Sequence, residues 1–441
     1  MLTVLLVVQA FNGVDGLALG LVIQNIKLDL ALSDTQLGVL SGIAFALFYS
    51  VMGIPIARWA DRGNRVTIIS LAAMAWSLLV ALCGIATNFT QLLMIRVGIS
   101  VGEAGCIPTA HSLISDYFNR AERPRAIAIF LLGGSISTLI GYFLAGWLNE
   151  YYGWRVTFMA LGLPGLVPAA VVWFTLRDPR YRKLPTAVDL GAGREKETAT
   201  GQAGRPSVGE VYATLMANRT FWHMLLCFSV MSFFGSGILQ WQPAFFIRSY
   251  GLKTGELGTW YALIYGVGGI LGTYLGGEWA SRFATNDERL QLKAMATAYS
   301  GLAGISALIY LVPSHYWAFG LMGIAALAGG ATNGPLFAII QTIVPNRMRA
   351  VAIAVIYLFA NLIGMGMGPL VAGALSDALR PLVGEESLRY ALLALCPGYL
   401  WGGWHLWQAA KSVNGDLQAV HHESSMTTSD ASAARSLISR A

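Results

Sequence analysis

Twelve apolar stretches alternate with polar segments along the 441 residues of this chain. Each reaches or exceeds the roughly 20 residues that an α-helix needs to cross a bilayer. The strands of a membrane barrel would be only about 10 residues long, with hydrophobicity of period two. Because 55% of the residues are hydrophobic and only 12% are charged, a soluble domain is excluded as well. We therefore expect an all-α membrane protein with twelve transmembrane helices, at residues 3–27, 35–57, 66–87, 90–114, 125–148, 154–176, 221–249, 256–280, 291–312, 315–341, 349–376 and 388–410.

Basic residues predict the orientation, because loops rich in Lys and Arg are retained in the cytoplasm. If the odd-numbered helices run outward, 22 of the 29 Lys and Arg residues fall on one side and six on the other, with Arg96 inside helix 4. We expect an inner-membrane protein with both termini cytoplasmic. The net charge of +6 follows from this asymmetry and gives no reason to expect a nucleic-acid partner. The chain is apolar from Leu2, without the basic region of a signal peptide, so we also expect a cytoplasmic leader before it.

A polar stretch at 177–219, rich in charge, Gly, Pro and Thr, divides the helices six and six and is typical of a linker. It contains an amphipathic piece near 208–216. RWADR at 58–62 is repeated as EWASR at 278–282, and RPRAIAI at 123–129 as RMRAVAI at 347–353, with offsets of 220 and 224. These offsets predict two parallel six-helix repeats with a substrate path between them. The expected units are an N-terminal bundle at 1–176, a C-terminal bundle at 220–410 and a cytoplasmic tail at 411–441.

Several sequences carry a family resemblance. ARWADRGNRV at 57–66 resembles the helix 2–3 loop of the major facilitator superfamily, with Ala57 where glycine is usual. RVGISVGEAGCIPTAHSLISDYF at 96–118, GWRVTFMALGLPGLV at 153–167 and LRDPR at 176–180 resemble the Spinster branch, which includes transporters of sphingosine-1-phosphate and lysophospholipids. The superfamily match covers essentially the whole chain, and the Spinster match is dense in helices 4 to 6. The resemblance implies a major facilitator fold of two pseudo-symmetric six-helix bundles.

The resemblance also implies a cytoplasmic gate. A carboxylate at the positive N-terminal end of a helix contributes about 0.3–2 kcal/mol, and here Asp61 would meet the start of helix 11 near Arg349. The alternative, a basic loop that only sets topology, explains Arg58 and Arg65 but not an aspartate among arginines. The expected gate residues are Asp61, Arg62, Arg65 and Arg125.

Two features depart from the family pattern. The helix 1 aspartate is usually followed by arginine, whereas Asp15 is followed by Gly16, so we expect Asp15 to lack its charged partner. The glycine-proline signature of antiporters is absent from helix 5, while helix 11 contains GMGMGPLVAG. The motifs therefore leave symport and antiport open.

Three charged residues lie deep inside the predicted helices: Asp15, Arg96 and Glu103. Each costs roughly 2.5–3.5 kcal/mol at the bilayer centre, so they should face a cavity or one another. Arg96 and Glu103 share one face of helix 4, about 10 Å apart along its axis, and Asn12 lies one turn before Asp15. We expect these four residues to carry protons or contact substrate. Alternatively, one carboxylate neutralises Arg96 as a structural pair, or Arg96 binds an anionic headgroup or ties helix-end carbonyls.

The second half has no such buried charge and is rich in aromatic residues. A polar first half facing an aromatic second half would suit an amphiphile, although transmembrane aromatics are commonly packing or interface anchors. The residues expected to line the cavity are Phe233, Gln240, Trp241, Tyr261, Tyr265, Tyr357 and Asn361.

Catalytic motifs are lacking: the chain has no Walker A loop and no His-Glu-x-x-His. We therefore expect no enzyme activity, cofactor or metal. The expected function is secondary active transport of a lipid-like or amphipathic small molecule by alternating access, coupled to protons, by a monomer surrounded by membrane lipids. A multidrug/proton antiporter, an organic-anion symporter and a passive lipid scramblase are the alternatives.

Overall fold

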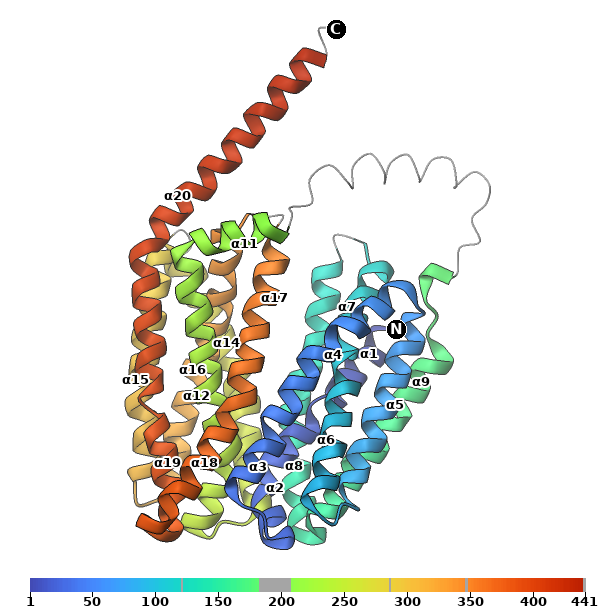
Figure 1. Ribbon diagram of the computed structural model, residues 1–441, viewed down its shortest axis with the longest axis vertical. Helices are drawn as coiled ribbons and strands as arrows, with labels where there is room; N and C mark the ends of the chain where they lie inside the picture. The colour runs from blue at the N-terminus through green and yellow to red at the C-terminus, as the bar shows by residue number, and fades with distance from the viewer. Residues whose placement is uncertain (120–121, 182–207, 285–286, 346–347, 439–441) are drawn as a thin grey trace.

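The computed structural model describes residues 1–119, 122–181, 208–284, 287–345 and 348–438, and within these ranges it contains helices and no strand. The helices form two bundles that converge at one end and diverge toward the other (Figure 1). We call the first the closed end. We call the second, where helix α11 (Val208–Ala217) lies, the linker end. Helix α11 coincides with the predicted amphipathic piece, whereas residues 182–207 of the predicted linker lie outside the described residues.

Glycines interrupt three crossings of the N-terminal bundle, at Gly13, Gly42 and Gly105. The helices of this bundle are α1 (Leu2–Phe11), α2 (Val14–Leu30), α3 (Asp34–Ser41), α4 (Ile43–Arg62), α5 (Arg65–Cys83), α6 (Phe89–Ala104), α7 (Cys106–Tyr117), α8 (Arg123–Gly162), η1 (Leu163–Gly165) and α9 (Leu166–Thr175), followed by η2 (Pro179–Tyr181).

The C-terminal bundle contains two π-helical segments, η3 and η4, which interrupt the crossings that correspond to helices 8 and 11. Such segments frequently occur at functional sites. The helices are α12 (Arg219–Tyr250), α13 (Thr254–Tyr261), η3 (Ala262–Gly268), α14 (Gly269–Phe283), α15 (Glu288–Leu311), α16 (His315–Ile343), α17 (Arg349–Phe359), η4 (Ala360–Met365), α18 (Gly366–Val383), η5 (Gly384–Glu386), α19 (Ser387–Leu395) and α20 (Gly398–Ile438).

The helix lengths are consistent with twelve crossings. Among the described residues, nine helical stretches are long and apolar enough to span a membrane, and two of them, of 51 and 68 residues, exceed a single crossing more than twofold. In the 51-residue stretch, Gly153 has a φ of 80°, which separates the fifth crossing from the sixth. The predicted crossing at 256–280 is helical but is not among the nine.

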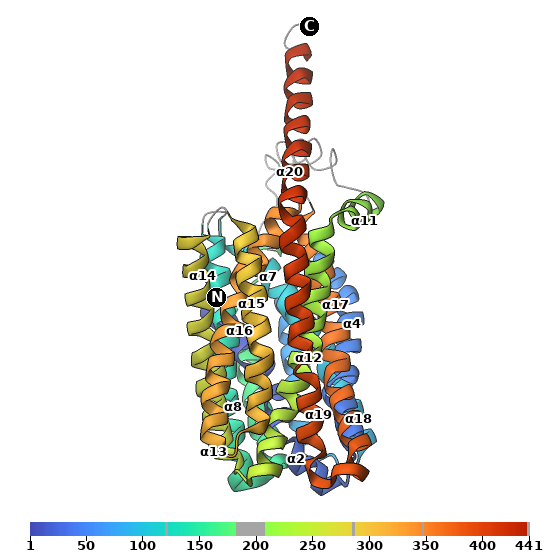
Figure 2. The same cartoon turned by 90° about the vertical axis from the view of Figure 1, so that its left-hand side faces the viewer.

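The last helix, α20, continues past residue 410 and extends beyond the bundle at the linker end (Figure 2). The predicted tail therefore begins inside a continuous helix. Residues 439–441 lie outside the described part.

The two bundles meet closely at two helix crossings near the closed end, α3 against α18 and α13 against α8. A Cβ added at Gly38 would lie 2.7 Å from backbone atoms of Leu370 and Pro369, and one added at Gly258 would lie 2.9 Å from the Cα of Gly146. Small residues allow this close approach of helix backbones. Gly38 and Gly258 are 220 residues apart, which is the offset of the first sequence repeat, so the two crossings are counterparts.

Candidate functional site

A cavity of about 350 Å³ lies between the bundles. Its volume is at the lower end of the range for small-molecule sites. Residues from both bundles form its wall: Asn12, Gly13, Asp15, Gly16, Leu17, Gly20, Ser41, Phe45, Ala46, Tyr49, Arg96, Glu103, Tyr142, Ser236, Leu239, Gln240, Asn361, Met365 and Pro369.

The break between α1 and α2 places polar groups at this wall. Gly13 has a φ of 80°, a left-handed conformation that glycine adopts readily. Its N–H, freed from the helical pattern, donates to Oε1 of Glu103 at 3.3 Å. The Nδ2 atom of Asn12 is buried and has no hydrogen-bond partner among the described residues. The break thus supplies an unused donor to the cavity and a hydrogen bond to a buried carboxylate.

Asp15 and Arg96 form a buried ion pair between Oδ2 and Nη1, with exposed fractions of 3% and 2%. The guanidinium also lies 5.4 Å from the ring centroid of Phe45. The expectation that Asp15 lacks a charged partner because of Gly16 is therefore wrong. The partner comes from another helix, α6, whose Arg96 side chain reaches Asp15 on α2, and a charged residue next in sequence is not required.

Glu103 lies next to this pair, in the last turn of α6, and is 4% exposed. It interacts with Asp15 and accepts the Gly13 hydrogen bond, but within the described residues it forms no ion pair of its own. Two carboxylates and one guanidinium carry a net charge of −1 when both acids are ionised. One proton brings the buried cluster to neutrality.

Gln240 and Asn361 lie in the cavity wall as expected, and Nε2 of Gln240 is buried without a partner among the described residues. The other five expected residues are not part of this wall. Trp241 is fully buried and donates to the Pro369 carbonyl at 2.8 Å. The hydroxyl groups of Tyr261 and Tyr265 donate to Oε1 of Gln242, at 3.2 and 2.8 Å.

The remaining two expected residues pack against neighbouring rings. Phe233 lies edge-on to Phe234, with centroids 4.9 Å apart, and Tyr357 stacks on Phe337 at 5.6 Å. The ring contacts agree with the packing role noted for transmembrane aromatics, although Tyr357 remains 48% exposed. Tyr265 borders a second cavity of about 750 Å³, which also contacts Tyr299 and Tyr399.

Aromatic residues of the cavity wall come from the N-terminal bundle, namely Phe45, Tyr49 and Tyr142. The division into a polar first half and an aromatic second half is therefore wrong for this wall. No sequence signal distinguishes Phe45, Tyr49 and Tyr142 from other aromatic residues, because aromatic residues are common in apolar helices. Their position in the cavity wall is determined by how the helices pack.

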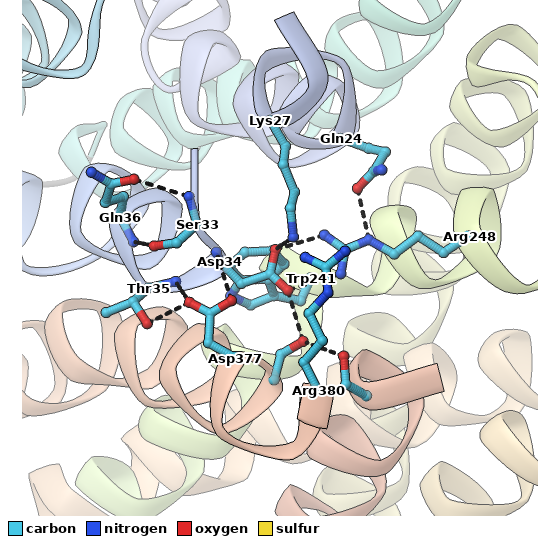
Figure 3. Close-up of polar contacts among 12 residues, drawn as sticks. Gln24, Lys27, Ser33, Asp34, Thr35, Gln36, Trp241, Arg248, Asp377 and Arg380 are labelled. Carbon is cyan, nitrogen blue, oxygen red and sulfur yellow. Dashed lines mark hydrogen bonds and ion pairs between the residues drawn. The ribbon is translucent and has the colours of Figure 1, made fainter. Parts of the chain in front are cut away.

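A second polar cluster at the closed end was not predicted (Figure 3). Asp34, 2% exposed, accepts hydrogen bonds from two nitrogens of Arg248 at 2.7 and 2.8 Å, from Lys27 at 2.6 Å and from the Ser376 hydroxyl at 2.7 Å. Arg248 also donates to Gln24 at 2.7 Å. Because Lys27 belongs to the N-terminal bundle and Arg248 and Ser376 to the C-terminal bundle, Asp34 links the two bundles.

The expected gate residues lie at the linker end. Asp61, Arg62 and Arg125 are exposed, and within the described residues the Asp61 carboxylate has no ion pair or hydrogen bond. The backbone carbonyl of Asp61 accepts a hydrogen bond from Arg180 at 2.9 Å. Helix α17, the proposed target of Asp61, has no side-chain cap in the described residues.

Arg65 differs from the other expected gate residues because it is fully buried inside the N-terminal bundle. It contacts Asp178 at 2.5–3.0 Å and Asp116 at 2.8 Å, and so ties the helix 2–3 turn to the end of α7 and to the segment after α9. Burial alone would raise the pKa of Asp178, but the hydrogen bonds from Arg65 outweigh it and hold this pKa below its ordinary value.

Two bundles of membrane-spanning helices around a central cavity with polar and apolar lining residues define a multi-pass membrane transporter. The family model of the Major Facilitator Superfamily matches residues 5–400, so the chain belongs to this superfamily. Members of this superfamily are transporters and not enzymes. The fold expected from the sequence is thus confirmed.

Individual relatives span nearly the same length. An MFS-type efflux pump of Mycolicibacterium smegmatis is 30% identical over 416 residues, which cover 94% of this chain and 93% of the pump. A probable L-galactonate transporter of Escherichia coli is 26% identical over 387 residues, covering 87% and 82%. Among solved structures, a bacterial homologue of the human lysosomal transporter Spinster, inward-facing and unoccupied, has a TM-score of 0.80 and 29% identity, covering 94% of this chain and 97% of that one. The resemblance to the Spinster branch is confirmed.

Proposed function

We propose that this transporter moves a small amphipathic or lipid-like molecule across the inner membrane by alternating access, driven by protons, with Glu103 as the proton carrier. The buried cluster of Asp15, Arg96 and Glu103 supports this proposal. Arg96 is already neutralised by Asp15, so Glu103 is the acid whose proton changes the net charge of the cavity between −1 and 0. Carboxylates inside the membrane mark substrate paths and proton relays in transporters.

The composition of the wall supports an amphipathic substrate. Arg96 and the unpartnered amides of Asn12 and Gln240 offer donors to a polar group. Apolar contacts for the rest of the molecule come from Leu17, Leu239, Met365 and the aromatic residues.

Organic-anion symport is the second candidate function. The Nε atom of Arg96 is buried and unpartnered among the described residues, so the guanidinium retains a free donor for a carboxylate. Relatives named as transporters of L-galactonate and cis,cis-muconate carry such anions. In this reading the proton on Glu103 accompanies the anion.

The orientation is part of the same proposal. The linker end carries most of the basic residues and is assigned to the cytoplasm. With this assignment the structure faces inward, which agrees with the inward-facing Spinster homologue that it resembles.

Glu103→Gln tests the proposal, because the amide keeps the size of the side chain and loses the titratable proton. Purified protein in liposomes is given a labelled lysophospholipid or labelled L-galactonate, with and without a pH gradient. We expect Glu103→Gln to keep substrate binding and to lose gradient-driven accumulation. Glu278→Gln, a change at a partly exposed carboxylate that pairs with Arg282, serves as the control.

Two results would contradict the proposal. If Glu103→Gln responds to the gradient like the parent, Glu103 is not the proton carrier. If the parent and the variant both equilibrate lipid without any gradient, the protein is a scramblase. The preference for one of the two labelled substrates distinguishes the amphiphile from the organic anion.

A further inference from the structure

The start of helix α3 is capped by a residue of the opposite bundle. The first N–H groups of a helix have no partner within the helix. The carboxylate of Asp377, on α18, accepts from the N–H groups of Asp34 at 3.1 Å and Thr35 at 2.7 Å, and from the Thr35 hydroxyl at 2.7 Å (Figure 3). An aspartate of the C-terminal bundle thus completes the first turn of a helix in the N-terminal bundle.

Helix α13 receives the same kind of cap in the reverse direction. Its own N-cap residue, Lys253, provides no side-chain hydrogen bond. Glu150, on α8, accepts from the N–H of Gly255 at 2.9 Å through Oε2. Its neighbour Asn149 donates to the Thr254 hydroxyl at 3.1 Å. A glutamate of the N-terminal bundle therefore caps a helix of the C-terminal bundle.

The two caps are counterparts in the two repeats. Helices α3 and α13 start at Asp34 and Thr254, 220 residues apart, which is the offset between RWADR and EWASR. The capping carboxylates lie on helices 5 and 11, whose starts share the RPRAIAI and RMRAVAI repeat. Each cap also lies beside a glycine crossing, Gly38 for one and Gly258 for the other. The same device thus occurs on both sides of the interface.

We propose that Asp377 and Glu150 form a reciprocal latch, a pair of helix caps that exists only while the closed end is shut. Separation of the bundles there breaks both caps at once. Helix α3 then retains Ser33, whose hydroxyl accepts from Gln36 N–H within the same bundle, whereas α13 retains no side-chain cap in the described residues. The latch therefore favours the state that is open at the linker end. This inference rests on the alternating access of the proposed function.

Spin labels measure the two states directly. The four native cysteines are buried, so pairs of introduced cysteines can be labelled at exposed positions, Leu28 with Leu382 at the closed end and Trp59 with Phe283 at the linker end. Double electron–electron resonance in detergent then gives the distance distribution of each pair. The variants are Asp377→Ala, Glu150→Ala and both together. Ser33→Ala is the matched control, since it removes a cap of α3 that both states share.

We expect each single variant to raise the ratio of closed-end-open to closed-end-shut molecules about fivefold, the effect of one helix cap. The double variant should approach the product, about 25-fold, because the two caps share no partner. The linker-end distances should shorten in parallel. Asp377→Asn keeps one acceptor oxygen and should give a smaller shift than Asp377→Ala, which provides a test if the alanine variant does not fold.

The latch is refuted if the double variant keeps the distributions of the parent at both ends. It is also refuted if Ser33→Ala shifts them as far as Asp377→Ala, because the caps would then only stabilise their helices. Neither substrate nor a proton gradient enters this measurement. An absent shift together with Glu103-dependent transport would overturn the latch alone, and a shift without Glu103 dependence would overturn the proton carrier alone.

Discussion

Gly38→Ala is the sharpest test of how the closed end is packed. The added Cβ would lie 2.7 Å from the Cα of Leu370 and 2.7 Å from the carbonyl oxygen of Pro369. Carbon atoms in ordinary contact are about 3.5–4.0 Å apart. Because both neighbours are backbone atoms, no side-chain rotation relieves the overlap. Helices α3 and α18 must therefore separate by about 1 Å for the variant to remain shut.

The steric overlap in Gly38→Ala destabilises only the state in which the closed end is shut. Overpacking of this kind costs about 1–3 kcal/mol, and it disappears when α3 and α18 part. The ratio of closed-end-open to closed-end-shut molecules should therefore rise roughly 5- to 150-fold. Alanine also stabilises a helix relative to glycine by about 0.5–1 kcal/mol. That gain applies equally to both states, so it changes overall stability and leaves the ratio unaltered.

Single-molecule fluorescence transfer between dyes at Leu28 and Leu382, in lipid nanodiscs, reports this ratio. Gly301→Ala in α15 is the control, because nothing lies within 4 Å of its added Cβ. Gly258→Ala, at the counterpart crossing, should shift the ratio in the same direction as Gly38→Ala. If Gly38→Ala gives the same distribution as Gly301→Ala, the glycine crossing does not limit closure.

Two further substitutions address the linker end. Asp61→Asn should increase the population that is open there, because it removes the charge proposed to meet the start of α17, which has no side-chain cap in the described part of the chain. A loss of about 1–2 kcal/mol corresponds to a roughly five- to thirtyfold increase. Spin-label distances between the ends of α7 and α16 measure it, and an unchanged or shorter distance contradicts the gate. Asp178→Asn should destabilise the folded state by about 1.5–3 kcal/mol, because it removes the charged hydrogen bonds from the buried Arg65 to Asp178 and leaves Asp116 as the remaining carboxylate partner of Arg65. Since the pKa of Asp178 is lowered in the folded state, this contribution is complete above the unfolded pKa of about 3.9 and is lost as the pH falls through the folded value. The melting temperatures of parent and variant should therefore converge below about pH 4, and a constant difference would refute the assignment.

The fold could be predicted because the bilayer imposes a length on every crossing and the repeats reveal the pseudo-symmetry. The breaks at Gly13, Gly42 and Gly105 could not. A glycine in an apolar run is equally consistent with close packing, and only the φ of 80° at Gly13 identifies a break. That break matters for the site because it frees the Gly13 N–H group, which donates a hydrogen bond to Glu103.

The central charges could be found from sequence because an ionisable residue inside the membrane is expensive and therefore has a reason to be there. Their pairing could not be found. The family pattern suggested a partner next to Asp15 in the sequence, whereas the partner, Arg96, is 81 residues away. Which carboxylate neutralises the guanidinium depends on the relative rotation of α2 and α6, which hydrophobicity does not specify. This pairing is what leaves Glu103 available for a proton.

The closed-end cluster was missed for a different physical reason. Its charged residues lie at the ends of crossings, namely Lys27, Asp34 and Arg248. A charge there costs little free energy, and in the sequence it cannot be distinguished from an ordinary charged loop residue. The repeat does not reveal the cluster either. At the offset of 220 residues Asp34 corresponds to Thr254, which is uncharged, so the Asp34–Arg248 ion pair has no counterpart in the second repeat. Gly38 and Gly258, in contrast, are both retained at this offset. The glycine crossings and caps therefore occur in both repeats, whereas the Asp34–Arg248 pair is present on one side only. The Asp34–Arg248 pair joins α3 to α12 and is buried, whereas the ion pair on the α13–α8 side, between Lys253 and Glu150, is 3.8 Å long and largely exposed at Lys253. Burial strengthens an ion pair, so electrostatic closure is stronger on the α3 side.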